Sequence, residues 1–365
     1  MSLKIGVVGA GRGRGPAGVF QHHKDCELVA IADRNPERLT ELADRLEVPH
    51  RYTDLDEMLA TDIDAVFVAT PAPVHTEHSV AALRAGKHVL CEVPAVYSIE
   101  EGQELVRAVR ETGLKYSFAE NMYYYPYIGT YERLIRDGEL GEIVYAEAEY
   151  IHNCEALMVD RPDGLGGGAA GVPTWRTALH PIQYLTHDLQ PLLRMLQDRC
   201  VSAIGLDTGC RKRPDLGVID MGVALLTTEK GTIIKQLNGF AVAKEPAHHW
   251  FVVYGTKGSL EQGRRAAGLG DSHYLYIEDR YANVNGPVRL DVPREHPGAP
   301  PEARLGGHGT SEYYMVDEFV QCILNDTEPP IDVYEALDST LPGICATQSM
   351  REGGRPVDVP DPRQW

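Results

Sequence analysis

Short apolar runs alternate with amphipathic segments of helical spacing from residue 3 to about residue 119. The apolar runs predict strands at Lys4–Val8, Leu28–Asp33, Ala65–Thr70, His88–Cys91 and Tyr116–Ala119. Helices are predicted between them at Pro36–Leu46, Leu55–Ala60, His75–Ala85 and Ile99–Thr112. Strands that alternate with helices form βαβ units around a parallel sheet, so an α/β domain is predicted over residues 1–120.

A glycine-rich turn follows the first predicted strand and precedes a predicted helix, which is the context of a dinucleotide-binding turn. Gly9 allows the tight turn and Gly11 allows close approach of the pyrophosphate, although Arg14 stands where a third glycine is usual. Asp33 ends the second strand, where an acidic residue binds the adenine ribose and repels a 2′-phosphate. We therefore predict a Rossmann domain that prefers NAD. The predicted cofactor-binding residues here are Gly9, Gly11, Arg12, Gly13, Asp33 and Arg34.

Two alternatives stay open at this site. Asp33 could instead cap the helix that begins at Pro36, and Arg34 leaves room for NADP.

The pattern changes after residue 120, where strand candidates follow one another. An α+β domain with a large, mostly antiparallel open sheet is therefore predicted over residues 121–365, with C-terminal helices that can pack back on the Rossmann domain. Asp163–Gly171 is glycine-rich and predicts a loop. The predicted strands are Glu142–Asn153, Val201–Leu206, Gly217–Thr228, Thr232–Phe240, Trp250–Tyr254 and Tyr274–Glu278, and the predicted helices are Pro181–Leu196 and Tyr313–Leu324.

The charge balance limits the class of ligand. A formal net charge of −18 argues against nucleic acid and fits a small-molecule substrate. No apolar run has the ~18 residues that would span a bilayer, so no membrane partner is expected. The seven cysteines include no CxxC pair, which predicts no metal site, no disulfide framework and a cytoplasmic location. Arg211–Arg213 is interpreted as a solvated loop, with an anion-binding patch as the alternative.

The segment from Ala65 to Pro94 resembles the Gfo/Idh/MocA oxidoreductases, through Ala69-Thr70-Pro71, His75, the run Ala81 to Lys87, and Glu92 with Pro94. This resemblance implies a Rossmann domain with an α+β substrate domain, a nicotinamide cofactor and a carbohydrate or cyclitol substrate. It also implies a homodimer or homotetramer formed through the sheet. Further predicted cofactor contacts are Thr70, Pro71, His75, Glu92, Asn121, Trp175 and Arg176. For Trp175 and Arg176, the alternative is that they lie in a surface loop without contact to the cofactor.

One position departs from the family's dehydrogenases, which usually have Glu-Lys-Pro where this chain has Glu92-Val93-Pro94. Valine cannot carry a proton, so alcohol oxidation would need another base. The Glu-Val-Pro-Ala form resembles the NAD-dependent glycosidases of glycoside hydrolase family 109. The segments Phe118–Asn121, Glu149–His152, Tyr184–Pro191 and Gly306–Gly309 resemble the same branch, although Leu185, Asp188 and Gln190 depart from it.

Candidate catalytic residues lie in these segments. Tyr150 and His152 share one face of a predicted strand, and Tyr184 and His187 share one face of a predicted helix. The resemblance implies transient oxidation of a sugar at C3, removal of the C2 proton, elimination at C1, addition of water and return of the hydride. His187 is the predicted general acid/base, Tyr184 or Tyr150 assists proton removal, and Glu120 and His152 orient the sugar.

Three functions remain open from the sequence: a glycosidase of this mechanism, a sugar or cyclitol dehydrogenase that has replaced the lysine, and a non-catalytic regulator that binds nucleotide or sugar. Val93 favours the first over the second.

Overall fold

The computed structural model describes residues 2–159, 171–244, 248–264, 272–278, 280 and 286–365. The chain divides into two compact units. Unit 1 comprises Met1–Tyr124, Pro297–Leu337 and Pro362–Trp365, and unit 2 comprises Tyr125–His296 and Asp338–Asp361. The predicted boundary at residue 120 lies close to Tyr124, and residues 297–337 belong to unit 1, as the predicted packing of C-terminal helices on the Rossmann domain allows.

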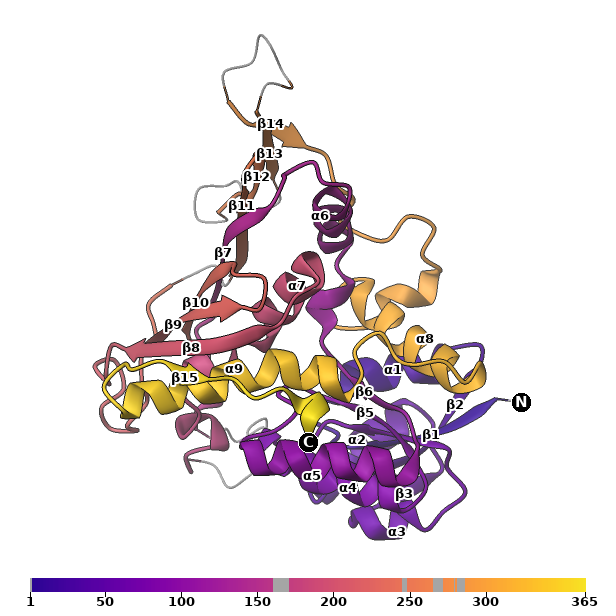
Figure 1. Ribbon diagram of the computed structural model, residues 1–365. Coiled ribbons are helices and arrows are strands. Elements are labelled where there is room, and N and C mark those ends of the chain that lie inside the picture. The colour runs from indigo at the N-terminus through magenta and orange to yellow at the C-terminus, as the bar shows by residue number, and fades with distance from the viewer. Residues whose placement is uncertain (1, 160–170, 245–247, 265–271, 279, 281–285) are drawn as a thin grey trace. The chain divides into compact units, whose positions relative to one another are not determined.

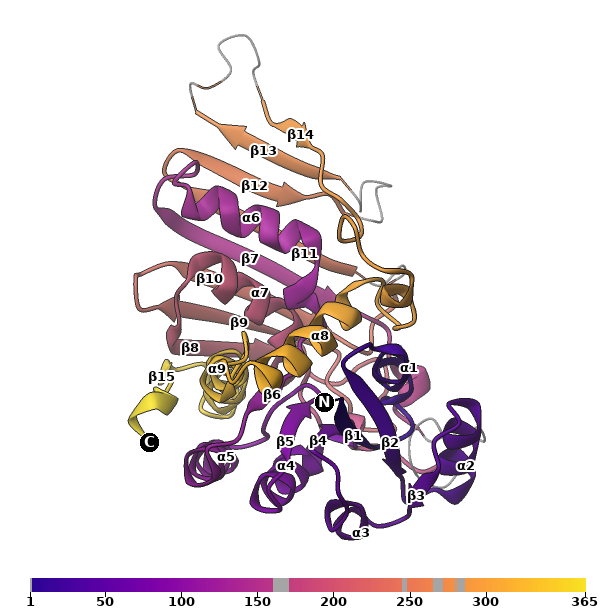
Figure 2. The ribbon, with the colours of Figure 1, turned by 90° about the vertical axis from the view of Figure 1, so that its right-hand side faces the viewer.

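Unit 1 contains a six-stranded sheet in the order β3-β2-β1-β4-β5-β6, and every pairing is parallel. The order reverses at β1, so right-handed crossovers place α1 and α2 on one face and α4 and α5 on the other (Figure 2). The strands are β1 (Leu3–Val8), β2 (Cys26–Ala32), β3 (His50–Tyr52), β4 (Ala65–Val68), β5 (His88–Cys91) and β6 (Tyr116–Phe118). The helices are α1 (Arg14–His22), α2 (Pro36–Arg45), α3 (Leu55–Leu59), α4 (His75–Arg84), α5 (Ile99–Thr112) and α8 (Ser311–Leu324).

Local signals set these helix ends. The Ser98 side chain accepts a hydrogen bond from Glu101 N at the start of α5, and Gly113 ends the helix in the left-handed region. Asn35 caps α2 by accepting from Arg38 N, so the alternative that Asp33 caps this helix is wrong.

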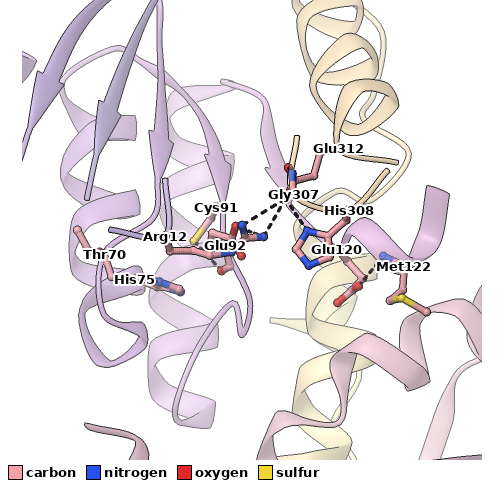
Figure 3. Close-up of polar contacts among 10 residues, drawn as sticks. All are labelled: Arg12, Thr70, His75, Cys91, Glu92, Glu120, Met122, Gly307, His308 and Glu312. Atoms are coloured by element: carbon pink, nitrogen blue, oxygen red, sulfur yellow. Dashed lines mark hydrogen bonds and ion pairs between the residues drawn. The ribbon is translucent and has the colours of Figure 1, made fainter. Parts of the chain in front are cut away.

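His75 ties together the segments that follow β4 and β5 (Figure 3). Its Nδ1 lies 2.9 Å from the carbonyl oxygen of Pro94, and its Nε2 lies 2.8 Å from that of Thr70. Carbonyl oxygens only accept, so both ring nitrogens donate and the ring is an imidazolium. Burial lowers the pKa of His75, but the sulfur of Cys91 and the two carbonyl hydrogen bonds outweigh it and raise the pKa to about 9.

Unit 2 contains a nine-stranded sheet in the order β14-β13-β12-β11-β7-β10-β9-β8-β15 (Figure 1). β7 pairs in parallel with β10, and the other pairings are antiparallel, as predicted. The strands are β7 (Ile143–Ile151), β8 (Cys200–Asp207), β9 (Met221–Thr228), β10 (Ile233–Gly239), β11 (His248–Gly255), β12 (Gly258–Gln262), β13 (His273–Ile277), β14 (Val288–Leu290) and β15 (Val357–Asp358).

Helices of unit 2 cover one face of this sheet. They are α6 (Pro126–Arg136), α7 (Thr186–Leu196) and the part of α9 (Val333–Arg351) that begins at Asp338. α7 packs against β7, and α9 approaches β8 so closely at Gly205 that a Cβ there would lie 2.2 Å from the carbonyl oxygen of Ala346. The opposite face includes partly exposed apolar side chains such as Leu225, Ile233 and Tyr254.

Several predicted elements differ from the structure. The predicted helix Pro181–Leu196 is a 3₁₀ turn, η5 (Pro181–Tyr184), followed by α7, and His180 caps this turn by accepting from Ile182 N. β9 begins at Met221 rather than Gly217, because the Asp220 carboxylate accepts from the amides of Arg211 and Lys212 in a turn. Residues 163–170 of the predicted loop Asp163–Gly171 lie outside the described residues. No helix in the described part of the chain is long and apolar enough to cross a membrane.

We expect Gly205→Ala to destabilise unit 2 by about 1–3 kcal/mol, because the new Cβ meets a backbone carbonyl that cannot rotate away. Gly129→Ala in α6 is the control, since its Cβ would come no closer than 3.9 Å to Arg194 and should stabilise the helix by ~0.5–1 kcal/mol. Urea denaturation, monitored by far-UV circular dichroism, measures the unfolding free energy of both variants. Equal stability of Gly205→Ala and the wild type would contradict the packing of α9 on β8.

We expect the stability contribution of His75 to depend on pH. Its folded-state pKa is raised, so the contribution is fully present below the unfolded pKa of about 6.5 and is lost as pH rises through about 9. The difference in unfolding free energy between the wild type and His75→Gln should therefore shrink between pH 6 and 10, by up to about 3 kcal/mol. Gln103→Ala, an exposed change in α5 that involves no titratable group, is the control and should show no such trend. A pH-independent difference for His75→Gln would refute the imidazolium.

Candidate functional site

The glycine-rich turn of unit 1 packs directly against the segment that follows β4. Gly9 has a φ of +99°, and a Cβ there would lie 2.4 Å from the carbonyl oxygen of Ala69. A Cβ on Gly13 would lie 2.5 Å from the carbonyl oxygen of Gly9. At Gly11 the nearest atom to a Cβ would be Nη1 of Arg38, at 3.3 Å, so side-chain atoms rather than backbone bound this position. Gly9 and Gly13 thus close the turn, whereas Gly11 leaves its backbone open to a ligand.

Helix α1 begins at this turn in a form suited to an anion. Gly13 is its N-cap, no side chain among the described residues caps it, and its first turn has no acidic residue. The first amides of a helix and its dipole favour a phosphate group at such an end.

Asp33 lies beside the same turn. Its Oδ2 accepts from Ala10 N at 2.7 Å, and its Oδ1 accepts from Asn35 N at 2.8 Å. A carboxylate has about four acceptor positions, so these two bonds orient Asp33 and leave capacity for ribose hydroxyls. The turn, the start of α1 and Asp33 therefore fit a dinucleotide.

Arg12 belongs to a charge network around the buried Glu312 in unit 1 (Figure 3). Its Nη2 lies 3.0 Å from Oε1 of Glu92 and 3.2 Å from Oε1 of Glu312, at the start of α8. Glu312 is fully buried and also accepts from His308 Nδ1 at 2.7 Å and from Gly307 N at 2.6 Å. Burial raises the pKa of Glu312, but the bonds and charges of His308 and Arg12 outweigh it and lower the pKa. Glu312 was not predicted from the sequence, because it lies 300 positions from Arg12.

The other predicted residues of unit 1 occupy several elements. Thr70 and Pro71 follow β4, with Thr70 Oγ1 3.0 Å from His78 Nδ1, and Arg34 is exposed after β2. Glu120 and Asn121 are buried around η2 (Asn121–Tyr124), and Oε1 of Glu120 accepts from Met122 N. The cofactor and substrate contacts of these residues stay predictions.

A row of residues crosses unit 2 on the helix-covered face of its sheet. Tyr150 of β7 is directly opposite Asn238 of β10 on one side and His249 of β11 on the other, and Gly222 of β9 is opposite Asn238. Residues opposite one another in paired strands point to the same face. The Nδ2 of Asn238 donates to the carbonyl oxygen of Tyr184, which places η5 over this row.

The four predicted catalytic residues of unit 2 meet at Tyr150. Its hydroxyl lies 3.0 Å from Nδ1 of His152, so these two side chains do share a face. The His187 ring meets the Tyr150 ring edge-on, with centroids 5.4 Å apart, and the Tyr184 ring meets His187 at 5.3 Å. Phe240 contacts both tyrosine rings. The structure therefore brings together residues from β7, η5 and α7, while their catalytic roles stay predictions.

The proton state of Tyr150 limits its role. Burial, followed by the charges of Tyr184, Cys154 and Asp188, raises the pKa of Tyr150 well above its usual value. Tyr150 is therefore a protonated hydrogen-bond donor near neutral pH, and a histidine is the better proton acceptor.

Two further residues of this cluster, His249 and Asp188, were not predicted from the sequence. Nδ1 of His249 lies 2.8 Å from Oδ1 of Asp188, which is fully buried on α7, and the His249 ring stacks on Tyr150 with centroids 4.2 Å apart. The predicted strand began at Trp250, one residue after His249, and only the strand register shows that His249 faces Tyr150.

Trp175 and Arg176 lie in η4 (Trp175–Thr177) of unit 2, with the Arg176 guanidinium 4.4 Å from the centre of the Trp175 ring. The positive charge of Arg176 acts to lower the pKa of Tyr150, against the effect of burial. Contact of these two residues with cofactor stays a prediction.

Family models match both parts of the chain. Residues 3–120 match the oxidoreductase family with an NAD-binding Rossmann fold, and residues 129–261 match the GFO/IDH/MocA C-terminal domain. Residues 220–364 match the glycosyl hydrolase 109 C-terminal domain.

Curated relatives carry the glycosyl hydrolase family 109 name. Glycosyl hydrolase family 109 proteins of Shewanella pealeana and Solibacter usitatus are each 26% identical to this chain, over 99% of its length and 85% and 88% of theirs.

Solved structures confirm the predicted fold class. Levoglucosan dehydrogenase in complex with NADH and levoglucosan matches with a TM-score of 0.83 at 20% identity, over 99% of this chain and 100% of that one. Scyllo-inositol dehydrogenase from Lactobacillus casei, with bound NAD(H) and scyllo-inositol, matches with a TM-score of 0.73 at 20% identity, over 98% and 99%. The predicted resemblance is confirmed: the chain belongs to the Gfo/Idh/MocA oxidoreductase family as an NAD-dependent enzyme, and its C-terminal part matches glycosyl hydrolase family 109.

Proposed function

We propose that this chain is a glycosidase that cleaves its substrate through transient oxidation of the sugar. The observation that carries the proposal is the cluster around Tyr150, where a protonated tyrosine meets His152, His187 and His249 in unit 2. Several neighbouring histidines suit a cycle with more than one proton transfer, because imidazole can both accept and donate a proton.

When bound, NAD supplies the redox step by accepting a hydride from a sugar carbon, proposed to be C3, and returning it at the end. The Gly9–Gly15 turn and Asp33 are the residues that would hold it. On the substrate side, a C3 ketone makes the C2 proton acidic, so a histidine removes this proton while the C1 substituent leaves. His187 acts as general acid/base, and Tyr150 and Tyr184 donate hydrogen bonds to sugar oxygens. His152 and Glu120 orient the remaining hydroxyls.

Val93 supports this function. It is buried, with 4% of its surface exposed, at the position where the family's dehydrogenases usually have lysine. Residue 93 therefore cannot carry out proton transfer, and the proposal assigns that role to histidines of unit 2, which suits a cycle centred on C2 and C1.

A sugar or cyclitol dehydrogenase is the alternative, favoured by one feature of α7. Asp188 and Gln190 replace glycines of the glycosidase branch, and both are fully buried, so they change the interior beside His187. In that case a histidine of the cluster takes the hydroxyl proton in place of the lysine.

We further propose a cytoplasmic homodimer or homotetramer. All seven cysteines are free thiols, which fits a reducing compartment. The partly exposed Leu225, Ile233 and Tyr254 on the open face of the sheet offer an apolar surface to a second copy.

We expect the purified protein to carry NAD and to release nitrophenol from a p-nitrophenyl glycoside over many turnovers, with no net NADH and no added cofactor. His187→Ala should lower kcat by roughly 10²- to 10⁴-fold, because it removes an acid/base group. Lys24→Ala, an exposed change in unit 1, is the control and should retain activity.

Absorbance at 340 nm and 405 nm separates the alternatives. Stoichiometric NADH formed from a free sugar, without nitrophenol release, would identify a dehydrogenase. Full turnover by His187→Ala on an alkyl glycoside, whose leaving oxygen must be protonated, as well as on the nitrophenyl glycoside, would remove this residue from the mechanism.

A further inference from the structure

His249 and Asp188 form a carboxylate–imidazole pair that the proposed function does not yet use. Asp188 comes from the first turn of α7 and His249 from the second residue of β11, and Nδ1 of His249 lies 2.8 Å from Oδ1 of Asp188. Asp188 is fully buried, whereas a quarter of the His249 side chain is exposed. The pair therefore joins a buried anion to a ring that solvent reaches.

The carboxylate fixes which ring nitrogen can accept a proton. A carboxylate only accepts hydrogen bonds, so Nδ1 of His249 carries the hydrogen and Nε2 of the neutral ring carries the lone pair. The buried charge also stabilises the imidazolium that forms when Nε2 takes a proton. This arrangement suits a general base more than a residue that only packs against the sheet.

The neighbours of His249 place that ring among the proposed catalytic groups. The ring stacks on Tyr150 at an interplanar angle of 17°, and the His187 ring meets it edge-on, with centroids 5.9 Å apart. Stacking and the bond to Asp188 together restrict both the position and the rotation of the imidazole. Among the described residues, the titratable or charged groups that neighbour Tyr150 and His187 include His152, Cys154, Arg176 and Tyr184.

We propose that His249 is the base that removes the C2 proton of the oxidised sugar, and that Asp188 is its positioning residue. This inference rests on the proposed function. The C2–H electron pair forms a C1=C2 double bond while the C1–oxygen bond breaks, and the C2 proton passes to Nε2 of His249. The departing oxygen takes its proton from His187, so the two histidines have opposite roles in one elimination.

Three variants test the pair on the p-nitrophenyl glycoside that the wild type hydrolyses. His249→Asn should lower kcat by roughly 10²- to 10⁴-fold with copurified NAD retained. Asp188→Asn should lower kcat, because the amide no longer holds the His249 ring in the Nδ1–H tautomer. Asp188→Glu, which keeps the charge, should recover part of the activity. Asp220→Asn is the control, since it removes the charge of another buried carboxylate, one bound to backbone amides.

A second readout does not depend on turnover. In ¹⁵N-histidine NMR spectra of the NAD-loaded protein, the His249 signal, assigned by its loss in His249→Asn, should show the Nδ1–H form when neutral. Asp188→Asn should change this tautomer balance. A wild-type Nε2–H form would overturn the proposal.

The outcomes separate the two proposals. An active wild type with an equally active His249→Asn would refute the role of His249 alone. A wild type that holds NAD but cleaves no glycoside would refute the proposed function, and with it this elimination step.

Discussion

The register of β7 in the nine-stranded sheet is the constraint on which the proposed chemistry depends. β7 pairs in parallel with β10 and antiparallel with β11, and this register sets Asn238, Tyr150 and His249 side by side. A shift of one residue would turn Tyr150 to the opposite face, away from α7. The helix then completes the cluster, because one turn of α7 supplies both His187 and the buried Asp188.

Unit 1 has a different constraint: two buried carboxylates, Glu92 and Glu312, must be balanced beside a turn that stays open to an anion. Glu312 is fully buried, and Arg12, His308 and Gly307 N satisfy its carboxylate. Removing a partner would leave the buried Glu312 carboxylate with fewer hydrogen bonds, so this network fixes α8 against the nucleotide-binding turn. His75 plays a similar part between the segments after β4 and β5.

Local patterns predicted most of the fold, because caps and periodicity are local. The helix Ile99–Thr112 and the strand His88–Cys91 have the predicted bounds. Tyr150 and His187 were also predicted for the candidate site, from motif and spacing. His249 and Asp188 were not, since they lie 61 positions apart and meet only through strand register and the packing of α7. Long-range pairings of this kind leave no periodic signal in the sequence.

Exchange at C2 of the sugar tests the central claim most directly. The wild-type enzyme should turn over a p-nitrophenyl glycoside in D₂O, and NMR of the released sugar should show deuterium at C2 and the original hydrogen at C3. A base that removes the C2 proton to a solvent-exchangeable group, followed by return of the same hydride to C3, predicts this labelling. A product with no deuterium at C2 would contradict the account, since hydrolysis would then proceed without oxidation of the sugar.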